Sequence, residues 1–286
     1  MEWGKAKQFV IILLLLLNVV LAGLNYKQKQ ESVMTSAQER AIFEVLSRNG
    51  ITMYTDILTE FAPMPRMLGQ VPSYGKETME RLFFGSQKTT VSQKGDATVY
   101  RKDGASLWLQ GSVGVWEDAS VLLGTEGLSR AAALQTAEAF LEGTEHFFGT
   151  YGTPMVSETA DGFEVLFYGT YKQDQVFSNS FSVFVTKAGI RRIAFDYCSI
   201  QGYYGEKKDI CYSDEALLTF MREWRKEAHE YEATIHRIEL GYGMTESGNA
   251  AGEETMTVTL EPFYRIYLME EEEPYLINAY TCQLVR

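Results

Sequence analysis

The residues of this chain whose side chains could do chemistry are few and widely spaced. The histidines are His146, His229 and His236, and the cysteines are Cys198, Cys211 and Cys282. None of them forms a CxxC pair or a His-Glu-x-x-His motif, the spacings that bring metal ligands together. The spacing therefore indicates neither a zinc site nor a thioredoxin-like site. Cys198 and Cys211 bracket a short loop and could be bridged, or all three cysteines could be packed thiols.

The histidines have structural explanations that involve no ligand. His236 alternates with apolar residues in a segment typical of a strand, so we expect it to face the core and to be hydrogen-bonded there. His146 and His229 follow helical segments, where the helix dipole stabilises a cation. A metal site formed by His146 and its neighbouring glutamates would require a second histidine that the fold brings close to it.

Other candidate motifs also favour structural roles. No Gly-x-Ser-x-Gly elbow, Walker loop or Ser-x-x-Lys set is present. The glycine-rich run 111–114 opens no helix and predicts a turn rather than a phosphate cradle. The acidic run 270–273 could bind calcium, but consecutive side chains diverge, which favours a solvated turn. Tyr203 and Tyr204 predict a turn folded against a sheet or an exposed aromatic contact. We therefore predict no catalytic residue, no cofactor and no metal, hence a protein that is not an enzyme.

The apolar run Phe9–Leu24 contains no charge and one polar residue, Asn18. As a helix it would reach roughly 24 Å, which approaches the hydrocarbon core of about 30 Å. It therefore predicts a single transmembrane helix over 9–24, after a cytoplasmic tail at 1–8. A cleaved signal peptide also fits, because Lys5 and Lys7 precede the run and Val20-Leu21-Ala22 offers small residues for a peptidase.

Both interpretations place the bulk of the chain outside the cytoplasm. Under the first, we expect localisation in the cell membrane with the N-terminus cytoplasmic and the C-terminal domain extracellular. Trp3 and Asn18 are then candidate contacts with a partner helix in the membrane. An interhelical hydrogen bond from a polar side chain such as Asn18 contributes about 0.6–2 kcal/mol. Asn18 could instead bond its own helix or be hydrated near the outer leaflet.

Composition limits the classes of partner. The net charge of −12 argues against nucleic acid and against adsorption to anionic lipid. The 17 tyrosines and 16 phenylalanines favour strands and a β-rich core. Three cysteines cannot form a disulfide scaffold, so the fold must be stabilised by its apolar core.

Helices and strands alternate along the rest of the chain. Helices are predicted from a Ser36–Glu39 capping box to Gly50, over Lys76–Phe84, and after N-caps at Ser129 and Ser213. Strands are predicted at Ile51–Leu58, Arg66–Val71, Lys88–Gln93, Ala97–Lys102, Ser106–Gln110, Val113–Glu117, Phe163–Tyr171, Phe181–Thr186, Ile190–Cys198, Ala233–Tyr242, Thr255–Met269 (bent at Pro262) and Tyr275–Gln283. Asp103-Gly104 predicts a tight hairpin.

These elements predict an α+β fold, with one N-terminal transmembrane helix followed by antiparallel β-meanders packed with helices. After a juxtamembrane linker at 25–35, we expect one α+β subdomain at 36–124 and a second at 125–286. The second subdomain shows the order helix–three strands twice, a candidate duplication of arrangement.

Motifs at both ends of the chain are similar to those of a known family. At the N-terminus they are Met1-Glu2-Trp3, the following lysines and Leu17-Asn18 in an apolar helix. At the C-terminus they are three strand motifs, Ile238–Tyr242, Leu260–Ile266 and Ile277–Ala279. With these motifs the chain resembles the YycI (WalI) family. The long Gly/Ala/Glu loop at 248–254 and the many tyrosines depart from the family pattern.

The resemblance implies a membrane-anchored, non-enzymatic regulator of a sensor histidine kinase, in a two-component system that controls cell-wall homeostasis. It also implies action with a YycH-like single-pass protein and contact with the kinase through the transmembrane helix and the extracytoplasmic domain. A different class remains open from the residues themselves. An extracytoplasmic binding module could capture a cell-wall fragment or a peptide at a sheet edge or groove. A wall hydrolase would need a converging nucleophile and base, which the sequence does not supply.

Overall fold

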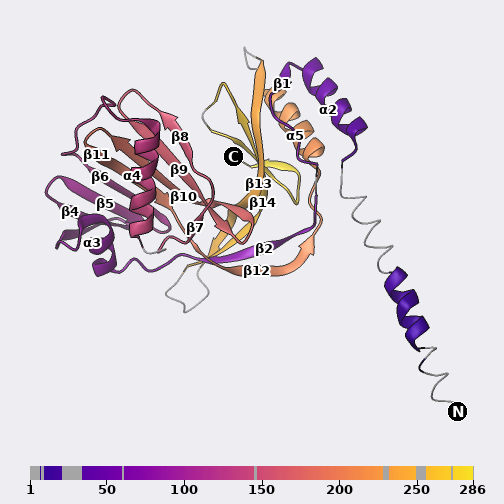
Figure 1. The fold of residues 1–286 in the computed structure, drawn as a ribbon, viewed down its shortest axis with the longest axis horizontal. Coiled ribbons are helices and arrows are strands. Elements are labelled where there is room, and N and C mark those ends of the chain that lie inside the picture. Colours follow the sequence, from indigo (N-terminus) through magenta and orange to yellow (C-terminus); the bar gives the residue numbers. More distant parts are fainter. Residues whose placement is uncertain are drawn as a thin grey trace. The chain divides into compact units, whose positions relative to one another are not determined.

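The structure is a computed structural model that describes residues 7, 10–20, 34–59, 61–144, 147–227, 232–248, 256–271 and 273–285 (Figure 1). Besides a helical stretch at 10–20, its helices are α2 (Ser36–Arg48), α3 (Lys76–Phe84), α4 (Arg130–Gly143) and α5 (Ser213–Lys226). Its strands are β1 (Ile51–Met53), β2 (Met64–Gln70), β3 (Thr90–Lys94), β4 (Ala97–Lys102), β5 (Ala105–Gln110), β6 (Val113–Asp118), β7 (Thr150–Tyr151), β8 (Met155–Glu158), β9 (Phe163–Tyr171), β10 (Asp174–Thr186), β11 (Gly189–Asp196), β12 (Ser199–Lys208), β13 (Ala233–Gly248), β14 (Thr257–Leu268), β15 (Tyr275–Asn278) and β16 (Gln283–Val285).

The described strands form one hydrogen-bonded sheet of 16 strands with the order β12-β2-β14-β13-β10-β11-β6-β5-β4-β3. Strands β7, β8 and β9 extend it from β10, β15 and β16 extend it from β14, and β1 pairs with β13. Most pairs are antiparallel, but β1–β13 and β10–β13 are parallel. The sheet is therefore mixed, and the prediction of purely antiparallel meanders is wrong at β13.

The predicted transmembrane helix is also wrong. In the part of the chain that the structure describes, no helix combines the length and apolar character needed to cross a bilayer. The apolar composition of the run 9–24 led to the prediction, and residues 9 and 21–24 of this run lie outside the described residues.

The chain divides into two compact units that are discontinuous in sequence. Unit 1 contains residues 1–64, 208–239 and 264–286, and unit 2 contains 65–207 and 240–263. Strands β13 and β14 each contribute residues to both units. The predicted boundary near residue 125 does not coincide with this division. In the described residues six strands follow α4 and four follow α5, where three were predicted after each helix.

In unit 2, helices α3 and α4 pack on one face of the sheet. Ala133 and Ala137 of α4 are fully buried there, and small side chains let the helix approach the strands closely. The strands contribute alternate residues to the same core, including Phe181, Val183 and Val185 of β10. Figure 1 shows α4 crossing the strands β9 to β11. The core is thus an aromatic and aliphatic layer between α3, α4 and one sheet face.

Local sequence explains the ends of several elements in unit 2. Helix α3 ends at Gly85, whose φ of 60° is the left-handed conformation that glycine adopts without strain. Ser129 caps α4 by accepting a hydrogen bond from the N–H of Ala132. Asp103 and Gly104 both have positive φ, as a tight two-residue hairpin requires. The predicted meander β3–β4–β5–β6 is confirmed.

Unit 1 is built on α2, α5, β1, β15, β16 and parts of β13 and β14. Its buried side chains include Leu46, Leu217, Phe220 and Ile235, all fully buried. The capping box of α2 lies one residue earlier than predicted: Thr35 and Gln38 cap each other's backbone. In α5 the N-cap position is taken by Tyr212 rather than Ser213.

Candidate functional site

The sheet of unit 2 has an open face opposite the helices, and four of its strands line a pocket there. Because strand residues alternate between faces, the burial of Val183 and Val185 places Ser182 and Phe184 on the opposite face. In register, Phe184 of β10 lies between Glu164 of β9 and Arg192 of β11.

A β-bulge changes this alternation in β11. Phe184 pairs with Arg192 while Val185 pairs with Ile190, so Arg191 is an extra residue without a partner in the ladder. Bulges redirect side chains and are frequent next to functional sites. Here the bulge allows two consecutive arginines, Arg191 and Arg192, to line the same pocket.

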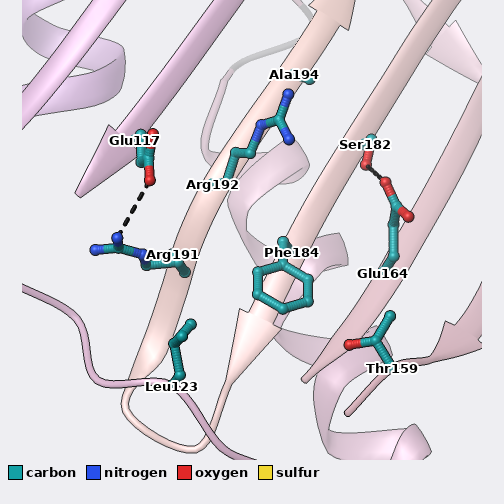
Figure 2. A pocket seen from close by; sticks show the side chains of 9 residues that line it. All are labelled: Glu117, Leu123, Thr159, Glu164, Ser182, Phe184, Arg191, Arg192 and Ala194. Carbon is teal, nitrogen blue, oxygen red and sulfur yellow. Dashed lines mark hydrogen bonds and ion pairs between the residues drawn. The ribbon is translucent and has the colours of Figure 1, made fainter. Parts of the chain in front are cut away.

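The pocket has a volume of about 390 Å³. Its lining residues come from β6, β9, β10, β11 and two adjoining loops: Glu117, Leu123, Thr159, Glu164, Ser182, Phe184, Arg191, Arg192 and Ala194 (Figure 2). This volume is in the range of small ligand sites and suits a few side chains of a bound segment.

Three of the four charged side chains in the pocket already have partners. Arg191 donates to the carbonyl of Asp118 and, at 3.2 Å, to a carboxylate oxygen of Glu117. Glu164 accepts a hydrogen bond of 2.7 Å from the hydroxyl of Ser182. Both pairs are drawn in Figure 2.

Arg192 differs from these three. Its side chain is exposed, and within the described residues it has no hydrogen bond or ion pair. Figure 2 shows it extending along β11 toward Ala194, away from the pair formed by Glu117 and Arg191. A guanidinium that is unpaired and held on a rigid strand is suited to bind a carboxylate in two-point geometry.

The rim of the pocket is held by backbone hydrogen bonds. Gly124 receives a bond from Lys187 at 2.8 Å and donates one to Asp161 at 2.8 Å, which ties together the two loops beside the pocket. Gly162 lies so close to Phe184 that a Cβ at this position would be 3.0 Å from the ring and 2.4 Å from the carbonyl of Val185. The absence of a side chain at 162 thus lets this loop close against the edge of the phenyl ring.

The arrangement is suited to binding an acidic group. Among the described residues that line it, the pocket combines one cation without a partner, one aromatic wall and carboxylates that are already bonded. The pocket can therefore accept an acidic group beside an apolar one.

The sequence predicted Trp3 and Asn18 as partner contacts, and Asn18 is not among the residues that line the pocket. Trp3 is outside the described residues. Asn18 donates from its side-chain amide to the carbonyl of Leu14 at 2.9 Å, so it bonds its own helix. A contact between Asn18 and a partner stays a prediction.

Two of the three histidines, His146 and His229, are outside the described residues. His236 is exposed on β13 and not in the core, so the prediction from alternation is wrong. The alternation changes between Ile235, fully buried, and Ile238, 8% exposed, which lie three residues apart. Desolvation and the nearby cation of Arg237 lower the pKa of His236.

The other sequence candidates have structural contacts. Tyr203 donates to Asp174 at 2.6 Å and lies in strand β12, not in a turn. Glu270 accepts the backbone N–H of Thr234 at 3.0 Å. Gly111 adopts a φ of 57° between β5 and β6, as the predicted turn requires.

The three cysteines are not bridged. Cys198 is buried, its thiol donates to the side-chain oxygen of Asn179 at 3.3 Å, and burial raises the pKa of this thiol to about 12. Cys211 and Cys282 lie together with Glu215, and the three ligand atoms are within 4.8 Å of one another. Within the described residues, this trio is the group that could hold a metal ion.

Sequence reasoning missed both the pocket and the cysteine trio. One indication of the pocket was present: Ile190 and Ile193 both pack on the core although they are three residues apart in a strand. Regular alternation would need an even spacing, so the odd spacing marks the bulge. No local pattern indicates the trio, because Cys211 and Cys282 are far apart in sequence.

No protein-family model and no curated protein matches the chain. Among solved structures, an uncharacterised protein of Eubacterium rectale superposes with a TM-score of 0.53 at 11% identity, covering 83% of this chain and 91% of that one. The C-terminal domain of YpeB from Bacillus megaterium superposes with a TM-score of 0.39 at 10% identity, covering 74% and 93%. At such identities the first likeness concerns the fold alone, and the second is a distant match.

Proposed function

We propose that this chain is a non-enzymatic regulator that acts by binding the extracytoplasmic part of a sensor histidine kinase, together with a YycH-like protein. The partner class comes from the resemblance to the YycI family. The observation that carries the mode of action is the pocket on the open sheet face of unit 2. There Arg192, which has no partner in the part of the chain that the structure describes, pairs in register with Phe184 of the neighbouring strand.

The C-terminal motifs of the resemblance form parts of strands β13, β14 and β15. Leu260, Tyr264, Ile266 and Ile277 within them are fully buried. These residues support a shared architecture, and they cannot themselves contact a partner. The binding surface must therefore be sought among exposed residues, which is where the pocket lies.

The pocket predicts the chemistry of the bound segment. A carboxylate of the partner would pair with Arg192, and an apolar side chain next to it would pack on Phe184. Glu117 and Glu164 lie on either side of Arg192 and Phe184 in the same row across the sheet. Their carboxylates would repel a second acidic group of the partner. We therefore expect a partner segment with one acidic residue adjacent to an apolar residue.

Export from the cytoplasm is part of this proposal. Lys5 and Lys7 followed by the uncharged run Phe9–Leu24 are typical of a segment that directs export. Cell fractionation with N-terminal sequencing of the mature protein tests it. Recovery of the unprocessed chain in the cytoplasmic fraction would refute the proposed location.

The binding experiment compares two charge reversals. Arg192→Glu changes the pocket, and Arg130→Glu makes the same change at an exposed position of α4, which packs on the opposite face of the sheet. Isothermal titration of the purified chain with the purified extracytoplasmic part of the kinase should show affinity reduced about tenfold or more by Arg192→Glu. Arg130→Glu should leave the affinity within about twofold. Equal effects of both variants, or no binding by the unaltered chain, would refute the proposal.

The size of the pocket favours a second candidate, the capture of a small ligand such as a peptide or a wall fragment. Thermal unfolding of the purified chain with and without wall peptides separates the two functions. A ligand that raises the melting temperature in the unaltered chain, and fails to do so in Arg192→Glu, favours the binding module over kinase contact.

A further inference from the structure

Two cysteines that are distant in sequence meet in unit 1. Cys211 precedes α5, Cys282 follows β15, and their sulfur atoms lie within 4.8 Å of each other. We propose that Cys211 and Cys282 are a reactive thiol pair that exchanges with a small external disulfide and closes into a Cys211–Cys282 disulfide.

The backbone of Cys211 is held on both sides. Its N–H donates to the carbonyl of Ala279 at 2.7 Å, and its carbonyl accepts the hydroxyl of the buried Tyr264 at 2.8 Å. The first bond links the residue directly to the C-terminal segment that carries Cys282. Cys211 is therefore fixed near its partner by the fold, before any covalent bond forms.

The backbone of Cys282 is held in a tight turn. Its N–H donates to the carbonyl of Asn278 at 2.8 Å, and its carbonyl accepts from the hydroxyl of Thr219 in α5 at 3.2 Å. The side chain of Asn278 stabilises the same turn by accepting the N–H groups of Tyr280 and Thr281. Cys282 has a φ of 53°, an unfavourable conformation for a residue with a Cβ. Such strain persists only where the surrounding bonds impose it.

The two thiols are not equivalent. Cys282 accepts a hydrogen bond from the thiol of Cys211, which lowers the pKa of Cys282. A hydrogen bond from Thr219 and the cation of Arg222 lower this pKa further, whereas burial and the carboxylate of Glu215 raise it. Donating that bond, together with burial, raises the pKa of Cys211 well above its ordinary value. Both side chains are half-buried, so a small reagent can reach them. The hydroxyl of Thr219 also lies 3.9 Å from the sulfur of Cys282, where it can stabilise a thiolate by donating to it. We therefore assign Cys282 as the attacking thiol and Cys211 as the thiol that resolves the intermediate.

The reaction is a thiol–disulfide exchange in two steps. The thiolate of Cys282 attacks one sulfur of the external disulfide, the sulfur–sulfur bond of that reagent breaks, and one thiolate leaves and takes up a proton. The thiol of Cys211 then loses its proton and attacks the sulfur of Cys282, releasing the second thiol. The cysteines lose two electrons and two protons, and the external disulfide gains them as two thiols.

A metal site is the alternative use of the same cluster. The trio Cys211, Glu215 and Cys282 supplies three ligand atoms, whereas structural zinc sites have four protein ligands. The carboxylate of Glu215 also accepts the N–H of Tyr212 at 3.0 Å at the start of α5, which uses one of its oxygens for the helix. These contacts favour the disulfide.

Closure would tie the C-terminal turn to the start of α5. The linked residues enclose a loop of about 70 residues, and long loops gain more stability from a disulfide than short ones. The oxidised chain should therefore melt roughly 5–10 °C above the reduced chain.

The test uses the whole chain with oxidised glutathione as the probe. After incubation, free thiols are alkylated, and the digested protein is mapped by mass spectrometry without reduction. We expect a peptide pair joined through Cys211 and Cys282, with Cys198 alkylated once the protein is unfolded. Cys211→Ser should stop at a mixed disulfide on Cys282, whereas Cys282→Ser should react at least about tenfold more slowly.

Cys198→Ala is the matched control and should form the same bridge as the unaltered chain. Mapping of the unaltered chain remains informative if a variant fails to fold. The proposal is overturned if both cysteines stay open to alkylation after excess oxidant, or if the bridge involves Cys198. It is also overturned if the reduced chain binds one equivalent of zinc that Cys211→Ser no longer binds.

Discussion

Replacement of Phe148 by alanine tests whether the aromatic core of unit 2 stabilises the fold without taking part in binding at the pocket on the opposite face. Phe148 is 1% exposed, and its ring centroid lies 4.7 Å from that of Phe195, 5.2 Å from Phe181 and 5.5 Å from Tyr197. Phe181 and Phe195 belong to β10 and β11, whose hydrogen bonds prevent them from moving into the vacated space.

The expected loss follows from this geometry. A buried Phe→Ala change costs about 3–5 kcal/mol, because transfer free energy is lost and a cavity remains. The close rings place Phe148→Ala near the middle or top of that range, since each well-oriented aromatic pair adds about 0.5–1.5 kcal/mol. For a chain of this size we expect the melting temperature to fall by roughly 8–15 °C.

Calorimetry and urea unfolding measure the effect, with Phe147→Ala as the matched control. Phe147 is the neighbouring residue, and it is only half-buried, so it should lose about 1–2 kcal/mol. Arg192→Glu should change the melting temperature little while weakening binding, because surface substitutions stay within about 0.5 kcal/mol. The reasoning fails if Phe147→Ala costs more than Phe148→Ala. It also fails if Phe148→Ala weakens binding under conditions where the variant is fully folded.

Two further substitutions test buried polar groups of unit 2. Burial raises the pKa of Asp196, although hydrogen bonds from Ser112 and the N–H of Tyr197 act in the opposite direction. The folded chain therefore favours the protonated carboxyl group. It loses stability as the pH rises from the ordinary pKa of about 3.9 through the raised pKa of the folded state. Asp196→Asn should therefore melt higher than the unaltered chain at neutral pH and lose that advantage below the ordinary value; a constant difference across a series of melting curves would contradict this. The hydroxyl of Tyr151 is buried without a hydrogen-bond partner in the described residues, so Tyr151→Phe should keep or raise the free energy of unfolding by up to about 1 kcal/mol. A measured loss above that amount in urea titrations would show that the hydroxyl is satisfied.

Local sequence predicts much of unit 2 because its turns carry clear residue signatures. Helix α3 has the predicted bounds because Gly85 ends it, and β4 and β9 have the predicted bounds because turns follow directly at Asp103-Gly104 and Lys172. Strand β12 was missed because its segment Ser199–Lys208 is polar and mostly exposed, so it lacks alternation. This segment is a strand because it pairs with β2 in the sheet, and the local sequence contains no pattern that predicts this pairing.

Sequence reasoning failed where distant segments meet or where a pattern allows two outcomes. The apolar run at 9–24 matched a membrane span in composition, whereas no helix among the described residues is long and apolar enough to cross a bilayer. The parallel pairing of Ile51 with Ala233 joins segments from different parts of the chain, which hydrophobic periodicity cannot reveal. The same limit hid the meeting of Cys211 and Cys282.

The extra residue of the bulge in β11, Arg191, means that the charge of the open face can change without a change in the core. If Arg191 were deleted, Ile190, Arg192 and Ile193 would follow one another as inward, outward and inward positions of an ordinary strand. The buried layer would keep its residues and its pairing, while the rim would lose one guanidinium and set Glu117 free. A one-residue insertion or deletion at this point could thus alter which ligands are accepted, in a lineage whose core stays the same.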